Sequence, residues 1–549
     1  MARNLNDGWV LGLSVVTAMA ASTTAGCPDE TSGKKISPTS VSVQASTASA
    51  GGAGGAGGVG GAGGSDDCGV GGAGGAGGCG LGGAGGAGGA GGADGCGVGG
   101  AGGAGGCAGV NPNAVATWST HSKDPSGDEL GTRVALDGTG AVIAGGSFTG
   151  AINFGSVLTS AGAEDVFIVK TNKDGTHLFS KRFGGIGVEQ LRGIAIDSAG
   201  NIVLVGMFND SVAFGGAMLT APNKSPTMFF AKLDKDGNHL VSYAVGDTQD
   251  QQAQAVAVDA LDNVYVTGQF KGVMDFEVAS GGSNALPALT ATEGFDIFLA
   301  KLDKDGKHVF SKSFGATGDQ QAWDVAAAPS GKIALAGTFT GKVDFGGGVL
   351  SNTTADGFVA MLDQDGKHVF TKELAGASVQ EARAIAVDGA GDVLVGGHFS
   401  GSFAIGNQLY TSSGGDDGFV AKLSGTTGEP LFGMTFGDAA TQRVLDLAIG
   451  SGGSTFAVGT SAGTVSLGET YATNGNDDAL VFKLDAAGVP LWAGLYGGSG
   501  VDEANACAAD ASGELVVVGD FVEKIDFGVG IATTENRDAF IAKFAGAQP

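Results

Sequence analysis

An acidic or amide side chain recurs seven times at a fixed place in this sequence. Each one stands eight residues before the Asp that ends a repeated apolar segment, or before its counterpart: Glu129, Glu189, Gln251, Gln320, Gln380, Gln442 and Asp502. Such groups around one opening would create a negative potential able to bind a cation or another polar ligand. The alternative is that each side chain hydrogen-bonds its local backbone and latches neighbouring repeats, because a residue in every copy usually serves the copy.

Two further repeated patterns could coordinate a metal ion. Asp-x-Asp-Gly turns are similar to calcium loops but lack the later carboxylates of an EF-hand; they lie at Asp234/Asp236, Asp303/Asp305 and Asp363/Asp365. Asp and Gly at a tight turn also have a local explanation. Four His residues share one position in successive copies: His177, His239, His308 and His368. On separate sheets they cannot meet at one ion, so we expect surface residues and no metal or cofactor, with calcium at the turns as the alternative.

The motifs of common enzymes are missing from the sequence. The segment Gly459-Thr-Ser461-Ala-Gly463 has the letters of a nucleophile elbow, but it ends a strand with no helix after it. There is no His-Glu-x-x-His and no phosphate loop ending in Gly-Lys-Ser/Thr. We therefore expect a protein that is not an enzyme.

The elements that carry these residues belong to one repeated unit. An apolar strand ends in Gly, a spacer and usually Phe, as in Gly146-Ser147-Phe148 and Gly206-Met207-Phe208. The same phrase begins at Gly268, Gly337, Gly397, Gly459 and Gly519. A period of about 60 residues is typical of arrays and propellers.

Each unit is expected to supply four strands. Alternation at period two, bounded by Asp-Gly turns, indicates antiparallel strands joined by hairpins. In the second copy these are strand A at 193–197, strand B at 202–208, strand C at 228–233 and strand D at 239–245. Four strands repeated seven times around an axis predict an all-β fold, a seven-bladed β-propeller over residues 111–549.

The two ends of the array complement each other. The last copy stops after its C strand, at 538–544, and the first is preceded by an extra strand around Trp118. Trp118 matches the aromatic position of the D strands, which is held by Phe179, Phe310, Phe370 and Trp492. We expect the N-terminal strand to complete the last blade, which removes the free edges of an open array.

Two segments of the third copy are distinctive: Ala255-Val-Ala-Val-Asp259-Ala-Leu-Asp-Asn263-Val-Tyr-Val-Thr-Gly268 and Asp296-Ile-Phe298-Leu-Ala-Lys301. With their counterparts over roughly residues 111–543, they make the chain resemble the bacterial SBBP (seven-bladed β-propeller) repeat. The resemblance implies an extracellular or surface setting. It implies no established chemistry and therefore no catalytic residues.

Residues 1–27 have the features of a signal peptide. Arg3 precedes an apolar stretch at 10–21 that is too short to span a bilayer. Thr24-Ala25-Gly26-Cys27 resembles a bacterial lipobox, with Thr24 where Leu is usual, so Cys27 would be lipidated. Simple cleavage is the alternative. We expect an exported lipoprotein at the outer membrane or cell surface, held to the membrane by its lipid anchor alone.

Residues 28–110 read as a low-complexity stalk. Gly-Gly-Ala repeats at 51–109 offer too little side-chain area to offset backbone entropy, so we expect a disordered spacer. Cys68, Cys79, Cys96 and Cys107 form an even set, expected to pair as Cys68–Cys79 and Cys96–Cys107, although the sequence leaves other pairings open. Cys507 falls on an apolar strand and is expected to be a buried free thiol.

The charge of the chain bears on its partners. With 29 basic and 56 acidic residues the net charge is -27, which disfavours nucleic acid. We expect a monomeric surface binding or adhesion module that contacts protein or glycan through the face of the D–A and B–C loops. An insertion at 278–292 in the third copy is a candidate contact. The alternatives are an extracellular polysaccharide hydrolase or lyase using Glu129, Glu189 and Asp502, and a structural surface-coat protein.

Overall fold

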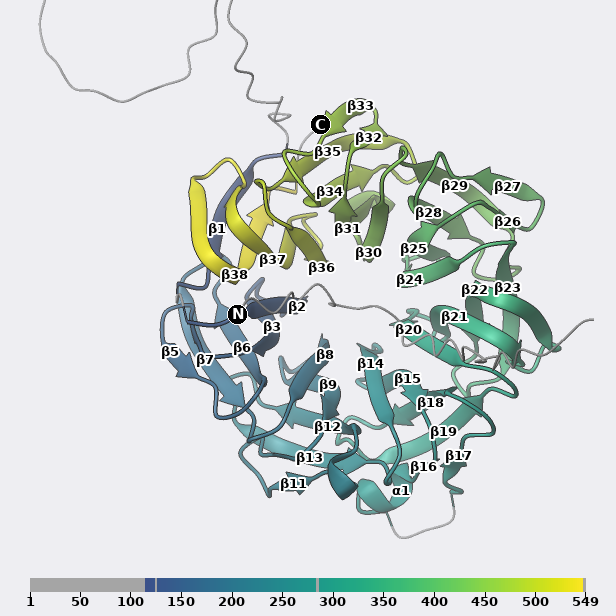
Figure 1. Ribbon diagram of the computed structural model, residues 1–549. Helices are drawn as coiled ribbons and strands as arrows, with labels where there is room; N and C mark the ends of the chain where they lie inside the picture. Colours follow the sequence, from purple (N-terminus) through teal and green to yellow (C-terminus); the bar gives the residue numbers. More distant parts are fainter. Residues whose placement is uncertain (1–113, 124–125, 283–285, 547–549) are drawn as a thin grey trace, which may run out of the picture. The chain divides into compact units, whose positions relative to one another are not determined.

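The computed structural model describes residues 114–123, 126–282 and 286–546. Figure 1 shows seven antiparallel sheets arranged as blades around a common axis. This confirms the predicted seven-bladed β-propeller. The predictions for residues 1–27 and 28–110 lie outside the described residues, as do Cys27, Cys68, Cys79, Cys96 and Cys107.

Each blade runs from its inner to its outer strand in the order A, B, C, D. Blades 1 to 3 are β2 (Glu129–Leu136), β3 (Val142–Phe148), β6 (Asp165–Thr171), β7 (His177–Phe183); β8 (Glu189–Ile196), β9 (Ile202–Phe208), β12 (Thr227–Leu233), β13 (His239–Val245); β14 (Gln251–Val258), β15 (Val264–Phe270), β18 (Asp296–Leu302), β19 (His308–Phe314). Blades 4 and 5 are β20 (Gln320–Ala327), β21 (Ile333–Val343), β22 (Leu350–Leu362), β23 (His368–Gly376); β24 (Gln380–Val387), β25 (Val393–Phe399), β28 (Asp417–Leu423), β29 (Pro430–Phe436). Blades 6 and 7 are β30 (Gln442–Ile449), β31 (Thr455–Ser461), β34 (Asp478–Leu484), β35 (Pro490–Tyr496); β36 (Glu503–Ala509), β37 (Leu515–Asp526), β38 (Ile531–Phe544), β1 (Ala116–His121).

Short elements decorate the connections between these strands. The B–C connections hold β4 (Ala151–Asn153), β5 (Val157–Thr159), β10 (Ser211–Val212), β11 (Leu219–Thr220), the turn η1 (Pro222–Lys224), β16 (Val273–Met274), α1 (Phe276–Ala279), β17 (Leu289–Thr290), β26 (Ser402–Ile405), β27 (Gln408–Thr411), β32 (Thr464–Leu467) and β33 (Glu469–Ala472). A single turn, η2 (Ser451–Gly453), joins β30 to β31. In the part of the chain that the structure describes, no helix is both long and apolar enough to cross a membrane.

Every innermost strand carries one β-bulge. In β8, Leu191 pairs with Gly206 and Gly193 with Val205, so Arg192 is an extra residue. The equivalent extra residues are Thr132, Gln254, Trp323, Arg383, Leu445 and Asn505. Because a bulge interrupts the alternation of side chains, the sequence pattern hides the first part of the strand. Strand A of the second copy therefore begins at Glu189, four residues before the predicted 193–197.

The glycine of the repeated Gly-x-Phe phrase follows from this bulge. A Cβ atom on Gly206 would lie 2.0 Å from the carbonyl oxygen of Gln190 and 2.9 Å from the ring of Phe229. The corresponding carbonyl lies 1.7 to 2.1 Å from such an atom in all seven blades. No other residue type fits without a shift of the backbone.

Apolar side chains fill the spaces between blades. One cluster combines Val134 and Phe148 of blade 1 with Val516 and Ile541 of blade 7. Complete burial of such a side chain contributes roughly 1.5–3 kcal/mol. The core is therefore a series of layers between neighbouring sheets.

The N-terminal strand closes the ring, as predicted. β1 pairs antiparallel with β38, and Trp118 lies opposite Lys543. The indole Nε1 of Trp118 donates to the carbonyl oxygen of Lys173 in blade 1 at 3.2 Å, and Lys543 Nζ donates to the same oxygen at 3.1 Å. Lysines of other blades make the same contact, since Lys170 Nζ donates to the Lys235 carbonyl of blade 2 at 3.1 Å.

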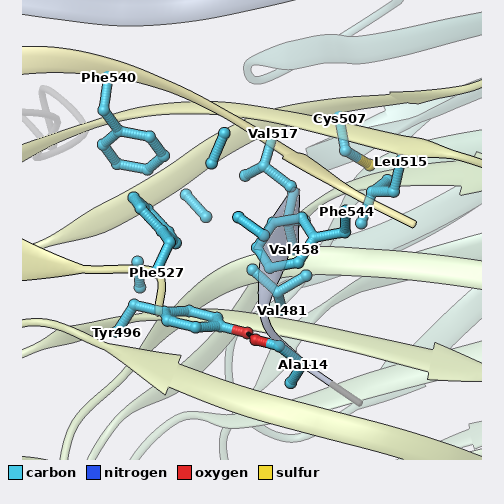
Figure 2. Close-up of a cluster of buried hydrophobic side chains, with 14 of the residues drawn as sticks. Ala114, Val458, Val481, Tyr496, Cys507, Leu515, Val517, Phe527, Phe540 and Phe544 are labelled. Carbon is cyan, nitrogen blue, oxygen red and sulfur yellow. Dashed lines mark hydrogen bonds between the residues drawn. The ribbon is translucent and has the colours of Figure 1, made fainter. Parts of the chain in front are cut away.

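The closing strand is also fixed from blade 6. Figure 2 shows the side chains at this junction, where the Tyr496 hydroxyl donates to the carbonyl of Ala114. The ring of Tyr496 lies 4.9 Å from that of Phe527 and 5.7 Å from that of Phe544, between centroids. The start of the described chain is thus held by two blades that come from its far end.

Candidate ligand-binding site at the channel mouth

The seven predicted ring residues occupy equivalent positions, at the start of each innermost strand or, for Asp502, directly before it. All of them are completely buried: Glu129, Glu189, Gln251, Gln320, Gln380, Gln442 and Asp502. The amide Nε2 of Gln251 donates to the carbonyl of Lys271 at 2.7 Å, and that of Gln320 to the carbonyl of Thr340 at 3.0 Å. Gln251 and Gln320 therefore latch their innermost strand to the segment that follows strand B, as the alternative interpretation predicts. We call the seven equivalent positions the latch. A ligand role for them stays a prediction, and it would require them to leave these bonds.

The three acids of the ring lie on three neighbouring blades, 7, 1 and 2. Glu189 accepts from the backbone N–H of Gly185 at 2.9 Å, and Asp502 accepts from those of Gly498 at 2.9 Å and Val522 at 3.1 Å. Burial, with the nearby Asp165 carboxylate, raises the pKa of Glu189 to about 7. Burial, with Asp478, also raises the pKa of Asp502 to about 7. The carboxyl groups of Glu189 and Asp502 are thus held by local backbone, and a hydrolase that uses Glu129, Glu189 and Asp502 together stays a prediction.

Three residues close to the predicted ones, Trp323, Arg383 and Leu445, line a cavity between the innermost strands. We call the seven extra residues of the bulges the bulge ring: Thr132, Arg192, Gln254, Trp323, Arg383, Leu445 and Asn505. The residues that follow the latch positions form the mouth ring: Leu130, Gln190, Gln252, Gln321, Glu381, Arg443 and Glu503. Both rings differ from blade to blade, unlike the latch. This contrast between varied and repeated positions is present in the sequence. It could not be interpreted there, because the bulge decides which face of the strand each position occupies.

Charged side chains form an arc of the mouth in blades 5 to 7. The Nε2 atom of His398 lies 3.8 Å from Glu381 Oε2 and 4.0 Å from Asp416 Oδ2. The same Asp416 oxygen lies 2.9 Å from the guanidinium of Arg443. Burial, with the charges of Arg443 and Arg383, places the pKa of His398 well below its usual value, so its ring is neutral at pH 7. Arg537 continues the arc, 2.9 Å from Asp520 in blade 7.

Amides and one indole form the arc of blades 2 to 4. Arg192 donates to the Oε1 atoms of Gln254 and Gln190, each at 2.8 Å. Trp323 donates through Nε1 to the Thr338 hydroxyl at 3.2 Å, and its ring lies 4.3 Å from the guanidinium of Arg383. Planar amides, guanidinium groups and an aromatic ring are the side chains that bind polar ligands with defined orientation.

A cavity of about 170 Å³ lies along the axis, between the innermost strands. Arg133, Trp323, Asp324, Arg383 and Asp446 line it with small apolar residues. Asp324 Oδ2 accepts from the backbone N–H of Ile385 at 2.8 Å, so its carboxylate is committed to the edge of the next blade. Because sites for drug-sized ligands measure roughly 300–1,000 Å³, this space admits a small group rather than a whole ligand. A larger ligand must therefore lie at the mouth.

Cys507 is a free, buried thiol on β36, as predicted. Its backbone N–H donates to Asp446 Oδ2 at 2.8 Å. Burial, with the charges of Asp446 and Asp324, raises the pKa of the Cys507 thiol well above its usual value. A thiol held in its protonated form is a poor nucleophile, which is the chemistry expected of a core residue.

The repeated histidines lie on the outer strands of blades 1 to 4. They are half-buried rather than surface residues, and the ring Nε2 atoms of His177 and His239 lie 2.8 and 2.9 Å from the hydroxyls of Ser180 and Ser242. The B–C connection covers them, since a Cβ on Gly216 would touch the His239 ring at 2.4 Å. Within residues 114–123, 126–282 and 286–546, no three His, Cys, Asp or Glu side chains gather as metal ligands would.

The Asp-x-Asp-Gly turns have a local explanation. Asp234 Oδ1 accepts from the backbone N–H groups of Asp236 at 2.9 Å and Asn238 at 2.7 Å. These bonds, of which that from Asn238 is the strongest influence, hold the pKa of Asp234 below its usual value. The first Asp therefore serves the turn, while calcium binding there stays an untested prediction.

The insertion at 278–292 is described except for residues 283–285. It begins within α1, which packs against the outer strands β13 and β19. At its other end the Thr292 hydroxyl donates to the carbonyl of Ala316 in the D–A connection at 2.8 Å, as the predicted neighbourhood requires. Glu277 lies 3.3 Å from the His308 ring, and the Ser280 hydroxyl accepts from the His308 backbone N–H at 3.2 Å. The B–C connection thus folds down the outer edge of blade 3, which the loop order alone does not show.

Comparisons with known proteins find only distant similarity. No known family profile matches the chain. A stretch of 162 residues is 30% identical to the regulatory protein FlaEY of Caulobacter vibrioides, covering 28% of this chain and 17% of that protein. A second stretch of 229 residues is 21% identical to the uncharacterized WD repeat-containing protein L264 of Acanthamoeba polyphaga mimivirus, covering 36% and 16%. The chain therefore spans less than a fifth of either relative.

Among solved structures, a chain of the mitotic checkpoint complex is similar at a TM-score of 0.41 and 10% identity, over 78% of this chain and 92% of that one. Likeness at this level transfers no function. The fold assignment rests on the strand pairing itself, and the resemblance to the SBBP repeat stays a prediction.

Proposed function

We propose that this propeller is a binding scaffold, without catalytic activity, that recognises its ligand at the mouth formed by the bulge ring and the mouth ring. One observation carries the proposal. Every blade has an acid or an amide at the latch position, but the fourteen residues of the two rings range from Leu and Trp to Gln, Glu and Arg and follow no sevenfold pattern. A side chain that serves the blade is repeated in each blade. Side chains that serve an asymmetric ligand must differ around the ring.

The setting of the scaffold follows from the sequence. We infer that the chain is exported, lipidated at Cys27 and displayed at the outer membrane or cell surface as an SBBP-type protein, where it contacts protein or glycan. Replacing Cys27 with Ser should release the chain from the membrane fraction and abolish incorporation of labelled palmitate. A chain that keeps both properties after this substitution contradicts the lipid anchor.

Binding at the mouth can be tested with the full-length chain on arrays of surface proteins and glycans. We expect Arg383→Ala to weaken binding by about tenfold or more, since it removes a charge and the cation–π contact with Trp323. Lys235→Ala is the matched control, because Lys235 is exposed in a C–D turn at the opposite end of the blades. Equal binding by wild type and Arg383→Ala would place the ligand elsewhere.

One observation favours an extracellular hydrolase as the second candidate. Burial, with the neighbouring Glu503 carboxylate, raises the pKa of Asp520, and Arg537 lies 2.9 Å from Asp520 and 3.9 Å from Glu503. A carboxyl group that keeps its proton near neutral pH can act as a general acid. Polysaccharide cleavage that is lost in Asp520→Asn but retained in Lys235→Ala would support this candidate.

A further inference from the structure

Several polar atoms at the mouth are buried and have no hydrogen-bond partner in the described structure. They come from four consecutive blades, 3 to 6: Gln269 Oε1, Gln321 Oε1, His398 Nδ1, Arg443 Nε and Thr460 Oγ1. Gln269, His398 and Thr460 are only 6%, 7% and 3% exposed. A buried polar group without a partner is costly, and most such groups in native proteins are paired. These five atoms share one entrance, where a ligand would complete their bonding.

These atoms lie at two repeated positions beside the axis. One position is the B-strand residue that pairs with the mouth ring, as Thr460 pairs with Arg443 and His398 with Glu381. The other is the mouth ring itself. Two residues show how the positions face each other across a blade boundary, since His398 of blade 5 and Arg443 of blade 6 flank the same Asp416 oxygen. The atoms without partners therefore follow the rim of the mouth.

The mixture of donors and acceptors restricts the chemistry of the ligand. The amide oxygens of Gln269 and Gln321 can only accept, and Arg443 Nε can only donate. Thr460 Oγ1 can do both, and the neutral ring of His398 offers one further site. A metal ion would satisfy only the acceptors and would meet the charges of Arg383 and Arg443. An anion would satisfy only the donors and would meet Glu381 and Asp416.

We propose that the mouth binds a neutral, hydroxyl-rich ligand, namely a sugar unit of an uncharged glycan. This rests on the proposed function and narrows its partner from protein or glycan to neutral carbohydrate. A hydroxyl group donates to one neighbour and accepts from another, as these residues require. The cavity of about 170 Å³ below the mouth receives a substituent, while the ring of the sugar stays at the rim.

The test uses the full-length chain with neutral oligosaccharides of glucose, mannose and galactose as probes, and with sulfated or uronic oligosaccharides and CaCl₂ as competing chemistries. Calorimetry measures affinity, and the fluorescence of Trp323, at the mouth, reports contact. We expect saturable binding of at least one neutral probe. Thr460→Val, which keeps the shape and removes the hydroxyl, should weaken it about tenfold. Thr176→Val, at an exposed position in the C–D turn of blade 1, should not change it.

Other outcomes overturn the inference. Preference for sulfated or uronic probes, binding of CaCl₂ alone, or unchanged affinity in Thr460→Val with unchanged thermal unfolding would each exclude a neutral sugar at this rim. A protein ligand that depends on Arg383, with no response to any saccharide, would overturn this inference while the proposed function stands. Binding that ignores Arg383→Ala would overturn the proposed function itself.

Discussion

At the scale of single residues, the latch position shows how a carboxyl group can replace an amide. In blades 3 and 4 the amide nitrogen of Gln251 or Gln320 donates to a carbonyl of the B–C loop. Glu189 occupies the same position in blade 2, and its carboxyl can donate a proton only when it is protonated. Around it stand Asp165, which forms an ion pair with Arg182, and Asp210. Burial therefore favours the protonated form of Glu189, whereas the Gln side chains at this position have no group that titrates.

This difference gives a prediction for Glu189→Gln. The folded-state pKa is about 7, above the usual value, so the stabilising contribution is complete at low pH and is lost as the pH rises through 7. The variant should be more stable than wild type at pH 8, by about 1–3 kcal/mol, and nearly equal to it at about pH 4, below the unfolded-state pKa. Urea unfolding at both pH values measures this. Gln251→Glu should be less stable than wild type at pH 8 but not at low pH. An equal gain in stability for Glu189→Gln at both pH values would contradict a contribution of Glu189 that depends on its proton.

The sequence could predict the latch positions but not their orientation. Counting back from the repeated Asp located Glu129 and its six counterparts, because the period is regular. Which neighbouring side chains face the axis depends on the bulge three residues later, which shifts the register of the strand by one residue. A shift of one residue moves side chains to the other face, and no residue type announces it. The two rings next to the latch, where we propose that the ligand binds, were missed for this reason.

At the scale of elements, the bulge and the glycine opposite it form a matched pair. The bulge turns an extra side chain toward the axis, and it brings a carbonyl group toward strand B. A Cβ on Gly397 would lie 1.8 Å from the Glu381 carbonyl oxygen, in a strand buried on both faces. The glycine of the Gly-x-Phe phrase, from which the repeat is recognised, is therefore required by the bulge in the neighbouring innermost strand.

Gly397→Ala should therefore be strongly destabilising. The added methyl group must displace backbone rather than a flexible side chain, so we expect a loss of about 2–4 kcal/mol in the free energy of unfolding. Gly389→Ala is the matched control, since nothing lies within 4 Å of its Cβ position. Thermal unfolding of the two variants compares them. Similar melting temperatures would show that the strands can move apart more easily than the contacts indicate.

At the scale of the whole molecule, the ring is held by contacts between the chain's two ends. Ser119 of β1 lies opposite Ala542 of β38, and this pairing was predictable from the missing D strand of the last copy. The number of blades and the closing strand follow from the repeat count and from the need to remove free edges. Features that recur in every repeat can be predicted from the sequence. The course of one irregular loop, such as the insertion in blade 3, cannot.

A disulfide across the closure tests its register. Ser119→Cys with Ala542→Cys should form a cross-link on mild oxidation and stabilise the propeller by about 2–4 kcal/mol, because the unfolded chain is constrained over most of its length. Ser119→Cys with Ser313→Cys, on the outer strand of blade 3, should not cross-link. Mass spectrometry under non-reducing conditions distinguishes the pairs. Equal cross-linking of both would argue against a fixed closing strand.

The buried carboxyl groups as a set predict the pH dependence of the whole propeller. Burial raises the pKa of Asp478 to about 6 and that of Asp502 to about 7, and it also raises the pKa values of Asp324 and Asp520. The folded state binds more protons than the unfolded state between about pH 4 and 7, so stability falls as the pH rises through this range. Denaturant midpoints should be higher at pH 5 than at pH 8. A flat or rising profile would contradict the burial of ionisable groups.

The pairing of β1 with β38 also has a consequence for how the protein is made. β1 leaves the ribosome before any other strand of the propeller, and its partner is the last to leave. During synthesis or export the ring stays open, with unpaired edges on both sides of the gap. A chain that ends before β38 cannot close the ring, because β1 then has no partner. Such a chain keeps open strand edges, whereas a complete chain does not. A protease or chaperone that binds open edges would therefore act only on the incomplete chains.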